Sequence, residues 1–441
     1  MIGGTKLIRN TALLTVSSLV MRGVGMLWQV WLAGRIGPAG IGLFGLVMSV
    51  GFLFITLAVS GIRFAVTRLI AEEVGRGRTG SVGGVVRRAG VYALFFGCAA
   101  MLGLYWGAGP IGFLWIGDAR TVLSLRLMAL SLPAGGISSL LAGYFTAVGR
   151  VWKTAAEQFA EQLARMALVV FALSRAPAED LSLVCAAVVG AGTVADNLGA
   201  AAMLALYAAD RRRTRGNGPA GRRLMPRMLR IAFPLALSAY ARSALSTFRQ
   251  LLVPKGLRLS GMSAEAALAG YGVINGMALP LLTFPTVLPA ALAEMLVPTL
   301  TEAQVSGGTA SLRRTVTVLL KNTFLLSSAA AAVFFVAADM LGGLIYHSPE
   351  AARYIRILAP MAPFIYTDIV TDGCLKGLGE MMRSMTYNIA EASLGLVLVW
   401  ALLPRRALGG YIFVLYFCEL FNFTLSVRRL WKVTAPEGVR G

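Results

Sequence analysis

The sequence predicts an all-α integral membrane protein with about 12 transmembrane helices. Of its 441 residues, 57% are hydrophobic and only 14% are charged, and the mean hydropathy is +0.72. Soluble domains contain roughly 25% charged and about 45–50% apolar residues, so this composition excludes a water-soluble globular protein. It also excludes an intrinsically disordered chain, which requires low hydrophobicity. Because one span needs about 20 apolar residues, the chain accommodates about twelve spans with short loops.

The hydropathy pattern places these spans one after another along the whole chain. They are expected at residues 11–33, 42–62, 89–107, 125–148, 155–174, 183–208, 229–253, 270–298, 317–338, 355–376, 385–403 and 409–427. We expect the first of them to be a membrane span rather than a cleaved signal peptide. Its apolar stretch is too long for a signal peptide and contains Arg22.

The distribution of basic residues predicts the orientation of the spans. The formal net charge is +21, from 41 Lys and Arg against 20 Asp and Glu. If the N-terminus is cytoplasmic, most basic residues fall in inner loops and termini, and the positive-inside rule then places both termini in the cytoplasm. Only the loop with Arg405 and Arg406 argues against this orientation. We therefore expect a multi-pass protein of the cytoplasmic membrane, whose basic loops face anionic lipid rather than nucleic acid.

A polar, basic stretch rich in Gly and Pro divides the chain near its middle, at residues 209–228. Six predicted spans precede it in residues 1–208, and six follow it in residues 229–441. The sequence therefore predicts two six-helix bundles joined by a basic cytoplasmic linker.

The two halves also begin alike, which favours a pseudo-symmetric repeat. A shift of 220 residues places Arg22 on Arg242 and Trp28 on Phe248. Because six spans is an even number, the halves share one orientation. A parallel repeat of this kind is a known transporter plan, and such transporters bind their substrate between the halves.

The sequence contains none of the familiar motifs for enzymatic or metal chemistry. The four cysteines, Cys98, Cys185, Cys374 and Cys418, lie in apolar runs without metal-binding spacing, which is typical of buried packing. The single histidine, His347, cannot form a metal centre by itself, and no nucleophile, zinc-protease or nucleotide-binding motif is present. We therefore expect no enzymatic activity, no cofactor and no metal site, and a protein that acts as a monomer.

Several predicted spans contain charged side chains. Each such charge costs at least about 2.5–3.5 kcal/mol at the centre of a membrane helix, so it usually faces the bundle interior or a water-filled cavity. The charged residues of the spans are Arg22, Arg63, Glu157, Glu161, Arg165, Asp196, Arg242, Arg249, Asp368, Asp372, Glu391 and Glu419.

The arginines are candidates for binding an anionic headgroup such as a diphosphate. Arginine binds phosphate bidentately, and Arg22, Arg242 and Arg249 together exceed what local pairing requires. Arg242 and Arg249 are seven residues apart and share one helical face. Arg63, at the end of the second span, is a further candidate. The alternative is that these charges only neutralise one another between packed helices.

Two groups of acidic residues have other predicted roles. Glu157, Glu161 and Arg165 follow one another at intervals of four, so they share one helical face. We expect them either to bind substrate or to pair within their own helix. Asp368, Asp372 and Glu391 are candidates for binding a coupling ion, such as a monovalent cation. Helix packing is the equally weighted alternative for the two aspartates.

Four segments resemble one known family. They are GIRFAVTRLIAEEVGRG at 61–77, GYFTAVGRVWKTAAEQFAEQLARM at 143–166, the proline-rich stretch 270–303, and LKGLGEM at 375–381. Together they resemble the stage V sporulation protein B family, and the segment at 143–166 is the most specific. That family belongs with the polysaccharide and lipid II flippases and the multidrug and toxin extruders. The resemblance implies two six-helix bundles, alternating access, a lipid-linked sugar cargo and a role in spore peptidoglycan assembly.

The chain departs from these families in two respects. The most similar families usually have fourteen spans, and in lipid II flippases the last two form a groove for the lipid tail, whereas twelve are predicted here. Drug extruders often have twelve spans, and many prokaryotic ones carry an acidic residue in the first span for proton coupling. The first span here has Arg22 and no Asp or Glu, which counts against that mechanism.

The leading hypothesis is therefore a flippase for a lipid-linked oligosaccharide or peptidoglycan precursor in the cell membrane. The alternative is a cation-coupled multidrug and toxin antiporter, in which Asp368, Asp372 and Glu391 bind the driving ion. A membrane scaffold for a wall-synthesis complex is the third class, and the many intramembrane charges disfavour it. The sign of the binding cavity distinguishes the first two, because a positive cavity favours anionic lipid and a negative one favours cationic drugs.

Overall fold

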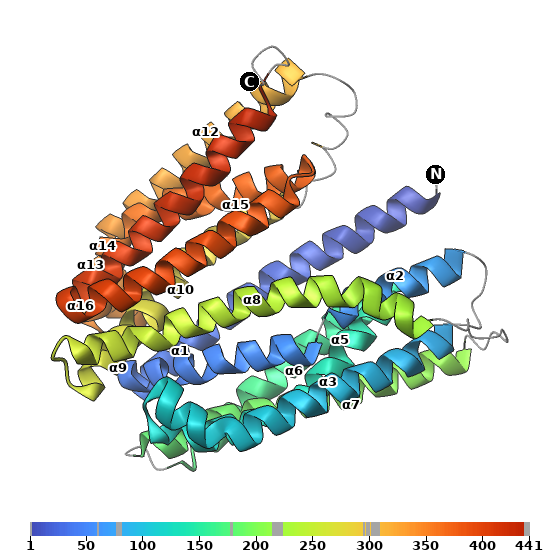
Figure 1. Ribbon diagram of the computed structural model, residues 1–441, viewed down its shortest axis with the longest axis horizontal. Coiled ribbons are helices and arrows are strands. Elements are labelled where there is room, and N and C mark those ends of the chain that lie inside the picture. Colours follow the sequence, from blue (N-terminus) through green and yellow to red (C-terminus); the bar gives the residue numbers. More distant parts are fainter. Residues whose placement is uncertain are drawn as a thin grey trace. The chain divides into compact units, whose positions relative to one another are not determined.

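The computed structural model describes residues 2–59, 61–75, 82–176, 180–213, 224–293, 296, 300 and 309–435 (Figure 1). Every regular element in these ranges is a helix, and none of the described residues forms a strand. The all-α prediction is confirmed. Of the basic linker predicted at 209–228, residues 214–223 lie outside the described ranges.

The first half begins with a long helix that bends at a glycine. Gly37, with φ of 72°, interrupts α1 (Ile2–Val59) immediately before Pro38, which cannot donate a backbone hydrogen bond. The remaining elements are α2 (Ile62–Gly75), α3 (Val82–Pro110), the π-helix η2 (Ile111–Ile116), η3 (Ala119–Thr121), α4 (Val122–Ala129), α5 (Leu132–Ala147), α6 (Val151–Leu173) and α7 (Leu181–Arg213).

The second half contains a comparable series of helices. They are α8 (Leu224–Leu259), α9 (Ala264–Gly272), the π-helix η4 (Val273–Ala278), α10 (Leu279–Thr283), η5 (Phe284–Thr286), α12 (Thr309–Val336), α13 (Ala338–Tyr346), α14 (Pro349–Leu358), η6 (Ala359–Met361), α15 (Ala362–Gly377) and α16 (Met381–Val433). Like α1, α16 contains one non-helical residue, Ala407, with φ of 47° and ψ of −136°. Helix α15 packs along both α12 and α16 (Figure 1).

The helices have the length and composition of membrane spans. Six helical stretches are long and apolar enough to cross a bilayer, and a seventh qualifies if the pair at Ala119–Ala129 and Leu132–Ala147, bent by 44°, counts as one span. Within the described residues, each of the twelve predicted spans falls on helix, with Gly37 and Ala407 separating the first two and the last two. The protein is an all-α membrane protein.

Contacts divide the chain into two compact units. Unit 1 consists of residues 1–21 and 46–247, and unit 2 consists of residues 22–45 and 248–441. Residues 22–45 of the first helix thus belong to unit 2, and the first part of α8 belongs to unit 1. Each unit has its own apolar core: α2, α3 and α5 contribute residues such as Ile70 and Phe145 in unit 1, and α12 and α15 contribute residues such as Val316 and Leu375 in unit 2.

The two halves contain the same left-handed residue, helix cap and backbone hydrogen bond at positions 230 residues apart. Gly117 and His347 both adopt the left-handed conformation at the end of a helix. The next residues, Asp118 and Ser348, each cap the following helix with their side chains. Their backbone N–H groups donate to the carbonyl oxygens of Gly112 and Gly342, at 2.9 and 3.1 Å.

The fourth span of each half follows the same register. Helices α5 and α15 both have 16 residues, and each ends in a left-handed glycine, Gly149 or Gly379. The backbone N–H groups of Arg150 and Glu380 then donate to the fifth carbonyl oxygen before them, both at 2.8 Å. These elements therefore do not follow the register of 220 predicted from the first spans, in which Arg22 falls on Arg242.

Candidate functional site

One cluster of charges in unit 1 lies between α6 and α7. Glu157, Glu161 and Arg165 share one face of α6, as their spacing predicts. Nη2 of Arg165 contacts Oε1 of Glu161 at 2.7 Å and Oδ1 of Asp196, from α7, at 2.5 Å. A Cβ at Gly199 would lie 2.4 Å from Oε2 of Glu161 and 2.6 Å from Oε1 of Glu157. A glycine on α7 is therefore what leaves room for the two carboxylates.

The α6–α7 cluster is not fully neutralised. It contains three carboxylates and one guanidinium, and Glu157 is buried. Oε1 of Glu157 and Nε of Arg165 are buried without a hydrogen-bond partner in the described part of the chain. An unpaired buried polar atom is costly and uncommon in native proteins, which makes this cluster a candidate binding site.

The central ion pair of unit 2 joins α8 to α16. Nη1 of Arg249 contacts Oε1 of Glu391 at 2.6 Å, and both side chains are less than one-third exposed. Gly395, one turn after Glu391, makes room for the arginine, since a Cβ there would lie 3.0 Å from Cδ and 3.1 Å from Nη1 of Arg249. The pair therefore links a residue predicted to bind phosphate with one predicted to bind the coupling ion.

Arg22 also belongs to unit 2, and its one hydrogen bond to the described residues is to a neutral group. Its Nη1 donates to Oγ1 of Thr286 at 3.3 Å. Seven residues later, Nε2 of Gln29 donates to the carbonyl oxygen of Gly276 at 3.1 Å. Gly276 lies in the π-helix η4, and π-turns are frequent at functional sites. Residues 22–29 thus present two polar groups to the proline-rich eighth span.

The other two candidate arginines are exposed and lie in unit 1. Arg242 is on the part of α8 that belongs to this unit, and Arg63 is near the start of α2. The structure therefore places Arg22 and Arg249 in one unit and Arg63 and Arg242 in the other.

The two aspartates of α15 have different partners. Oδ2 of Asp368 accepts a hydrogen bond from Nδ2 of Asn422 at 2.8 Å. Asp372 is instead paired with Nζ of Lys376 at 2.5 Å and accepts a hydrogen bond from Ser384. Asp372 is thus neutralised within its own helix, whereas Asp368 has no cationic partner among the described residues.

Asp368 and Asn422 each have a buried oxygen atom without a hydrogen-bond partner. In both residues this atom is Oδ1, which no donor in the described part of the chain reaches. Nδ2 of Asn422 also lies 3.4 Å from Oδ1 of Asn388. Carboxylate and amide oxygens are ligands for hard cations, so these two atoms are candidate ligands. Among the described residues, no group of three or more His, Cys, Asp or Glu is placed to hold a metal ion, and the set of Asp368, Asp372 and Glu391 stays a prediction.

Sequence reasoning missed an ion-pair cluster at the end of α7 in unit 1. Asp210, only 2% exposed, contacts Arg150, Nζ of Lys153 at 2.5 Å and the hydroxyl of Tyr144 at 2.8 Å. The sequence shows a single carboxylate at the end of an apolar span, which indicates that Asp210 needs a partner. It does not indicate which residues pair with it, because they lie about 60 residues earlier in the chain.

Sequence reasoning also missed the corresponding pair of unit 2. Nε and Nη2 of Arg429 donate to the two oxygens of Glu380 at 3.1 and 2.7 Å. Glu380 occupies the position that Arg150 has in the first half. The charges at this position are therefore reversed between the halves, and no local pattern indicates the distant partners.

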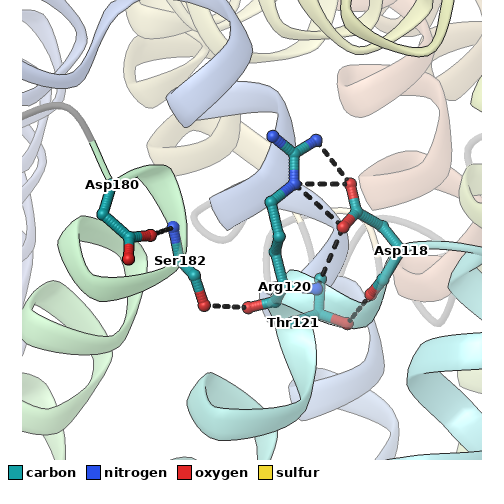
Figure 2. A network of polar contacts seen from close by, with 5 residues as sticks. All are labelled: Asp118, Arg120, Thr121, Asp180 and Ser182. Atoms are coloured by element: carbon teal, nitrogen blue, oxygen red, sulfur yellow. Dashed lines mark hydrogen bonds and ion pairs between the residues drawn. The ribbon is translucent and has the colours of Figure 1, made fainter.

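A third network in unit 1 holds Arg120 against Asp118 and α7. Figure 2 shows Arg120 turned back on Asp118, with Nε and Nη2 donating to both carboxylate oxygens at 2.7 to 3.2 Å. The hydroxyl of Ser182, from α7, donates to the carbonyl oxygen of Arg120 at 3.0 Å. This network joins the start of α7 to the cap before α4.

Comparison with known proteins gives the family of the chain. Residues 7–304 match the model of the polysaccharide biosynthesis protein family, and residues 256–401 match that of the MatE family. Stage V sporulation protein B of Bacillus subtilis is 25% identical over 91% of this chain and 79% of the relative. The lipid II flippase MurJ of the same organism is 22% identical over 92% of this chain and 79% of the relative.

Solved structures agree with the fold. An inward-facing multidrug resistance MATE family transporter of the MOP superfamily superposes with a TM-score of 0.73, at 15% identity and over 95% of both chains. At this identity the likeness concerns the fold alone. The family model covers well over half of the sequence, and the chain belongs to the polysaccharide biosynthesis protein family.

Proposed function

We propose that this protein is a flippase that moves a lipid-linked oligosaccharide or peptidoglycan precursor across the cytoplasmic membrane by alternating access. Its family and its similarity to a sporulation protein and to a lipid II flippase support this assignment. The observation that carries this proposal is that Arg22 and Arg249 each have few polar contacts among the described residues. Both lie in apolar helices, yet one is held by a hydroxyl and the other by a single carboxylate contact.

These arginines have the chemistry that a phosphorylated headgroup requires. A guanidinium presents a planar fork of donors that matches phosphate oxygens. A charge inside a membrane helix is tolerated beside water, a counter-charge or an anionic ligand. We propose that Arg22 and Arg249 contact the phosphates, with Arg242 and Arg63 as further contacts from unit 1. The acyl chain remains in lipid, so only the polar headgroup must be shielded.

A monovalent cation is proposed to drive the cycle. Asp368 and Asn422 each offer a buried oxygen atom that lacks a partner among the described residues, and Glu391 and Glu419 are the neighbouring carboxylates. We propose that the cation binds this oxygen-rich group. Glu157, Glu161 and Arg165 are proposed to contact polar parts of the substrate in unit 1. In this proposal the protein acts as a monomer and performs no chemical reaction.

A second function, cation-coupled drug extrusion, is supported by a different observation. The α6–α7 cluster contains three carboxylates and one arginine, and an acidic cluster suits a cationic drug. The MatE match at 256–401 and the MATE transporter fold are in line with this alternative.

A transport assay in proteoliposomes separates the two functions. The flippase proposal predicts translocation of a lipid-linked precursor and no accumulation of a cationic dye. Arg22→Ala and Arg249→Ala should each reduce precursor translocation at least tenfold, because each removes a phosphate contact. Arg314→Ala, at an exposed position of α12, is the matched control and should keep wild-type transport. Dye accumulation that both variants retain would favour the drug antiporter.

The proposed orientation is testable by itself. With both termini in the cytoplasm, reporter fusions after residues 78 and 215 should report a cytoplasmic position. A fusion after residue 348 should report the outside. An outside report at 215 would contradict the arrangement of two halves with one orientation.

A further inference from the structure

Two hydrogen bonds join the first span to the eighth within unit 2. Nε2 of Gln29 donates to the carbonyl oxygen of Gly276 at 3.1 Å, and Nη1 of Arg22 donates to Oγ1 of Thr286 at 3.3 Å. Arg22 and Gln29 therefore lie on one face of their helix, two turns or about 10.5 Å apart along its axis. The proposed function uses Arg22 and leaves the role of Gln29 open.

Gln29 donates to a carbonyl group that has no α-helical donor. In an α-helix the carbonyl oxygen of residue 276 accepts from the N–H of residue 280, and Pro280 has no N–H. The π-helix η4, in which hydrogen bonds span five residues rather than four, lies at this point. A Cβ at position 276 would lie 2.6 Å from Cγ2 of Ile41, so a glycine is what brings this backbone within reach of the first span.

A side chain from α16 holds η4 as well. The hydroxyl of Tyr411 donates to Oδ1 of Asn275 at 2.8 Å, and Nδ2 of Asn275 donates to the carbonyl oxygen of Tyr271 at 3.2 Å. Because π-helices are rare, this one needs support from outside its own backbone. The bonds from Gln29 and Tyr411 supply that support at two successive residues of η4.

The position of Thr286 determines how Arg22 is held. Thr286 is 6% exposed, and its hydroxyl donates to the carbonyl oxygen of Thr283 at 2.6 Å. Since the hydroxyl proton is used in this way, the oxygen is left to accept from Arg22. This one hydrogen bond to the described residues orders the long arginine side chain without neutralising its charge. The other N–H groups of the guanidinium match the oxygens of a phosphate group.

We propose that Gln29 is a positioning residue for the phosphate site at Arg22. Its bond to Gly276 stabilises the π-helix, the π-helix sets the direction of Thr286, and Thr286 orders the guanidinium before the cargo binds. Binding of the phosphate then loses less side-chain entropy, because Arg22 is already ordered. This inference rests on the proposed flippase function and deepens it. Gln29 itself acts through the protein and not on the phosphate.

The test measures the affinity of the purified full chain in detergent for pyrophosphate, by calorimetry at one pH and one ionic strength. Gln29→Met removes the donor at similar volume and should weaken binding about fivefold, the usual effect of having to order one long side chain. Thr286→Val should weaken binding by the same factor. Their double variant should bind no more weakly than either single variant, because both act through one arrangement. Gln158→Met, at an exposed position of α6, is the matched control and should bind like the wild type.

A change of the backbone separates positioning from simple hydrogen bonding of the carbonyl group. Pro280→Ala restores the N–H that an α-helix donates to Gly276, so Gln29→Met/Pro280→Ala should unfold near the wild-type temperature. Its affinity should stay about fivefold below that of the wild type, because continuation as an α-helix turns Thr286 away from Arg22. This variant keeps the test decisive even if Gln29→Met alone is too unstable to titrate.

The outcomes distinguish failure of this inference from failure of the proposed function. Wild-type affinity in Gln29→Met, or in Gln29→Met/Pro280→Ala, would overturn the positioning role and leave the phosphate site intact. Losses that multiply in Gln29→Met/Thr286→Val would also overturn it, because Gln29 would then act by a route other than Thr286. Wild-type affinity in Arg22→Ala would instead remove the phosphate contact on which the proposed function depends.

Discussion

The loops after α5 and after α15 have the same backbone but opposite charges. Both end a 16-residue helix, both pass through a left-handed glycine, and both place a charged residue next. In unit 1 this residue is Arg150, paired with Asp210, and in unit 2 it is Glu380, paired with Arg429. What the repeat preserves is therefore the link between the fourth and the last span of a half, and the sign of each charge is free to invert.

The two links also differ in how deeply they are buried. Asp210 is 2% exposed and contacts Arg150, Lys153 and Tyr144, whereas the Glu380 and Arg429 side chains are 20% and 23% exposed and form an ion pair with each other. Breaking a buried ion pair leaves an uncompensated charge, and an exposed pair contributes far less. The link in unit 1 should thus be the more costly one to break.

The largest effect is expected from Asp210→Asn. This change leaves Arg150 and Lys153 without their carboxylate and should lower the free energy of unfolding by about 3 kcal/mol. Thermal unfolding in detergent, followed by the fluorescence of a thiol-reactive dye, measures the loss. Asp180→Asn, which keeps the side-chain oxygen that caps the start of α7, serves as a control and should change the free energy of unfolding little, because Asn and Asp are comparable N-caps. Equal losses in the two variants would contradict the special burial of Asp210.

A smaller effect is expected where a glycine makes room for charged groups. Gly199→Ala should push the carboxylates of Glu157 and Glu161 out of place, and overpacking of this kind costs about 2 kcal/mol. The matched change in unit 2 is Gly395→Ala, where the nearest atoms are 3.0 Å away rather than 2.4 Å. It should cost less, because the arginine side chain can move by a few tenths of an ångström. A larger loss for Gly395→Ala, measured by the same unfolding assay, would reverse this ranking.

The smallest effect is expected from exchanging charges in unit 2. Glu380→Arg alone places two cations together, and Arg429→Glu alone places two anions together, so each should cost about 1 kcal/mol. The double variant should recover most of this loss, because this partly exposed pair has no other charged partner among the described residues that fixes its polarity. The same exchange of Arg150 and Asp210 should not recover stability, because Lys153 and Tyr144 both donate to a carboxylate at position 210. Recovery in unit 1 as well would show that those two donors contribute little.

The fold was predictable because it depends on patterns that extend over whole helices. Twenty apolar residues in succession identify a span wherever its neighbours lie, and the predicted spans indeed fall on helices. The register of the repeat was not predictable from Arg22 and Arg242. The described elements from Gly112 and Gly342 onward keep one spacing of 230.

The candidate site was predictable only where partners are close in sequence. The spacing of Glu161 and Arg165 predicted a pair within one helix, which the structure contains. The contribution of Asp196 came from another helix and had no local signal. Asp372 pairs with Lys376, which follows it by four residues in the same helix, and its role beside Asp368 as a ligand of the coupling ion stays a prediction.

The π-helix η4 lies within the eighth span and affects which side chains of that span face Arg22. An α-helix turns by about 100° per residue, and a π-turn accommodates one additional residue while the helix continues. Each residue after Ala278 therefore points about one residue's turn away from the direction it would have in an uninterrupted α-helix. Thr286 is one of these residues, and its hydroxyl accepts the hydrogen bond from Arg22. Insertion or deletion of a single residue at 273–278 would rotate the proline-rich segment against the arginine. A one-residue change in length at this π-helix can thus change which side chains of the segment face Arg22 without substituting any of them.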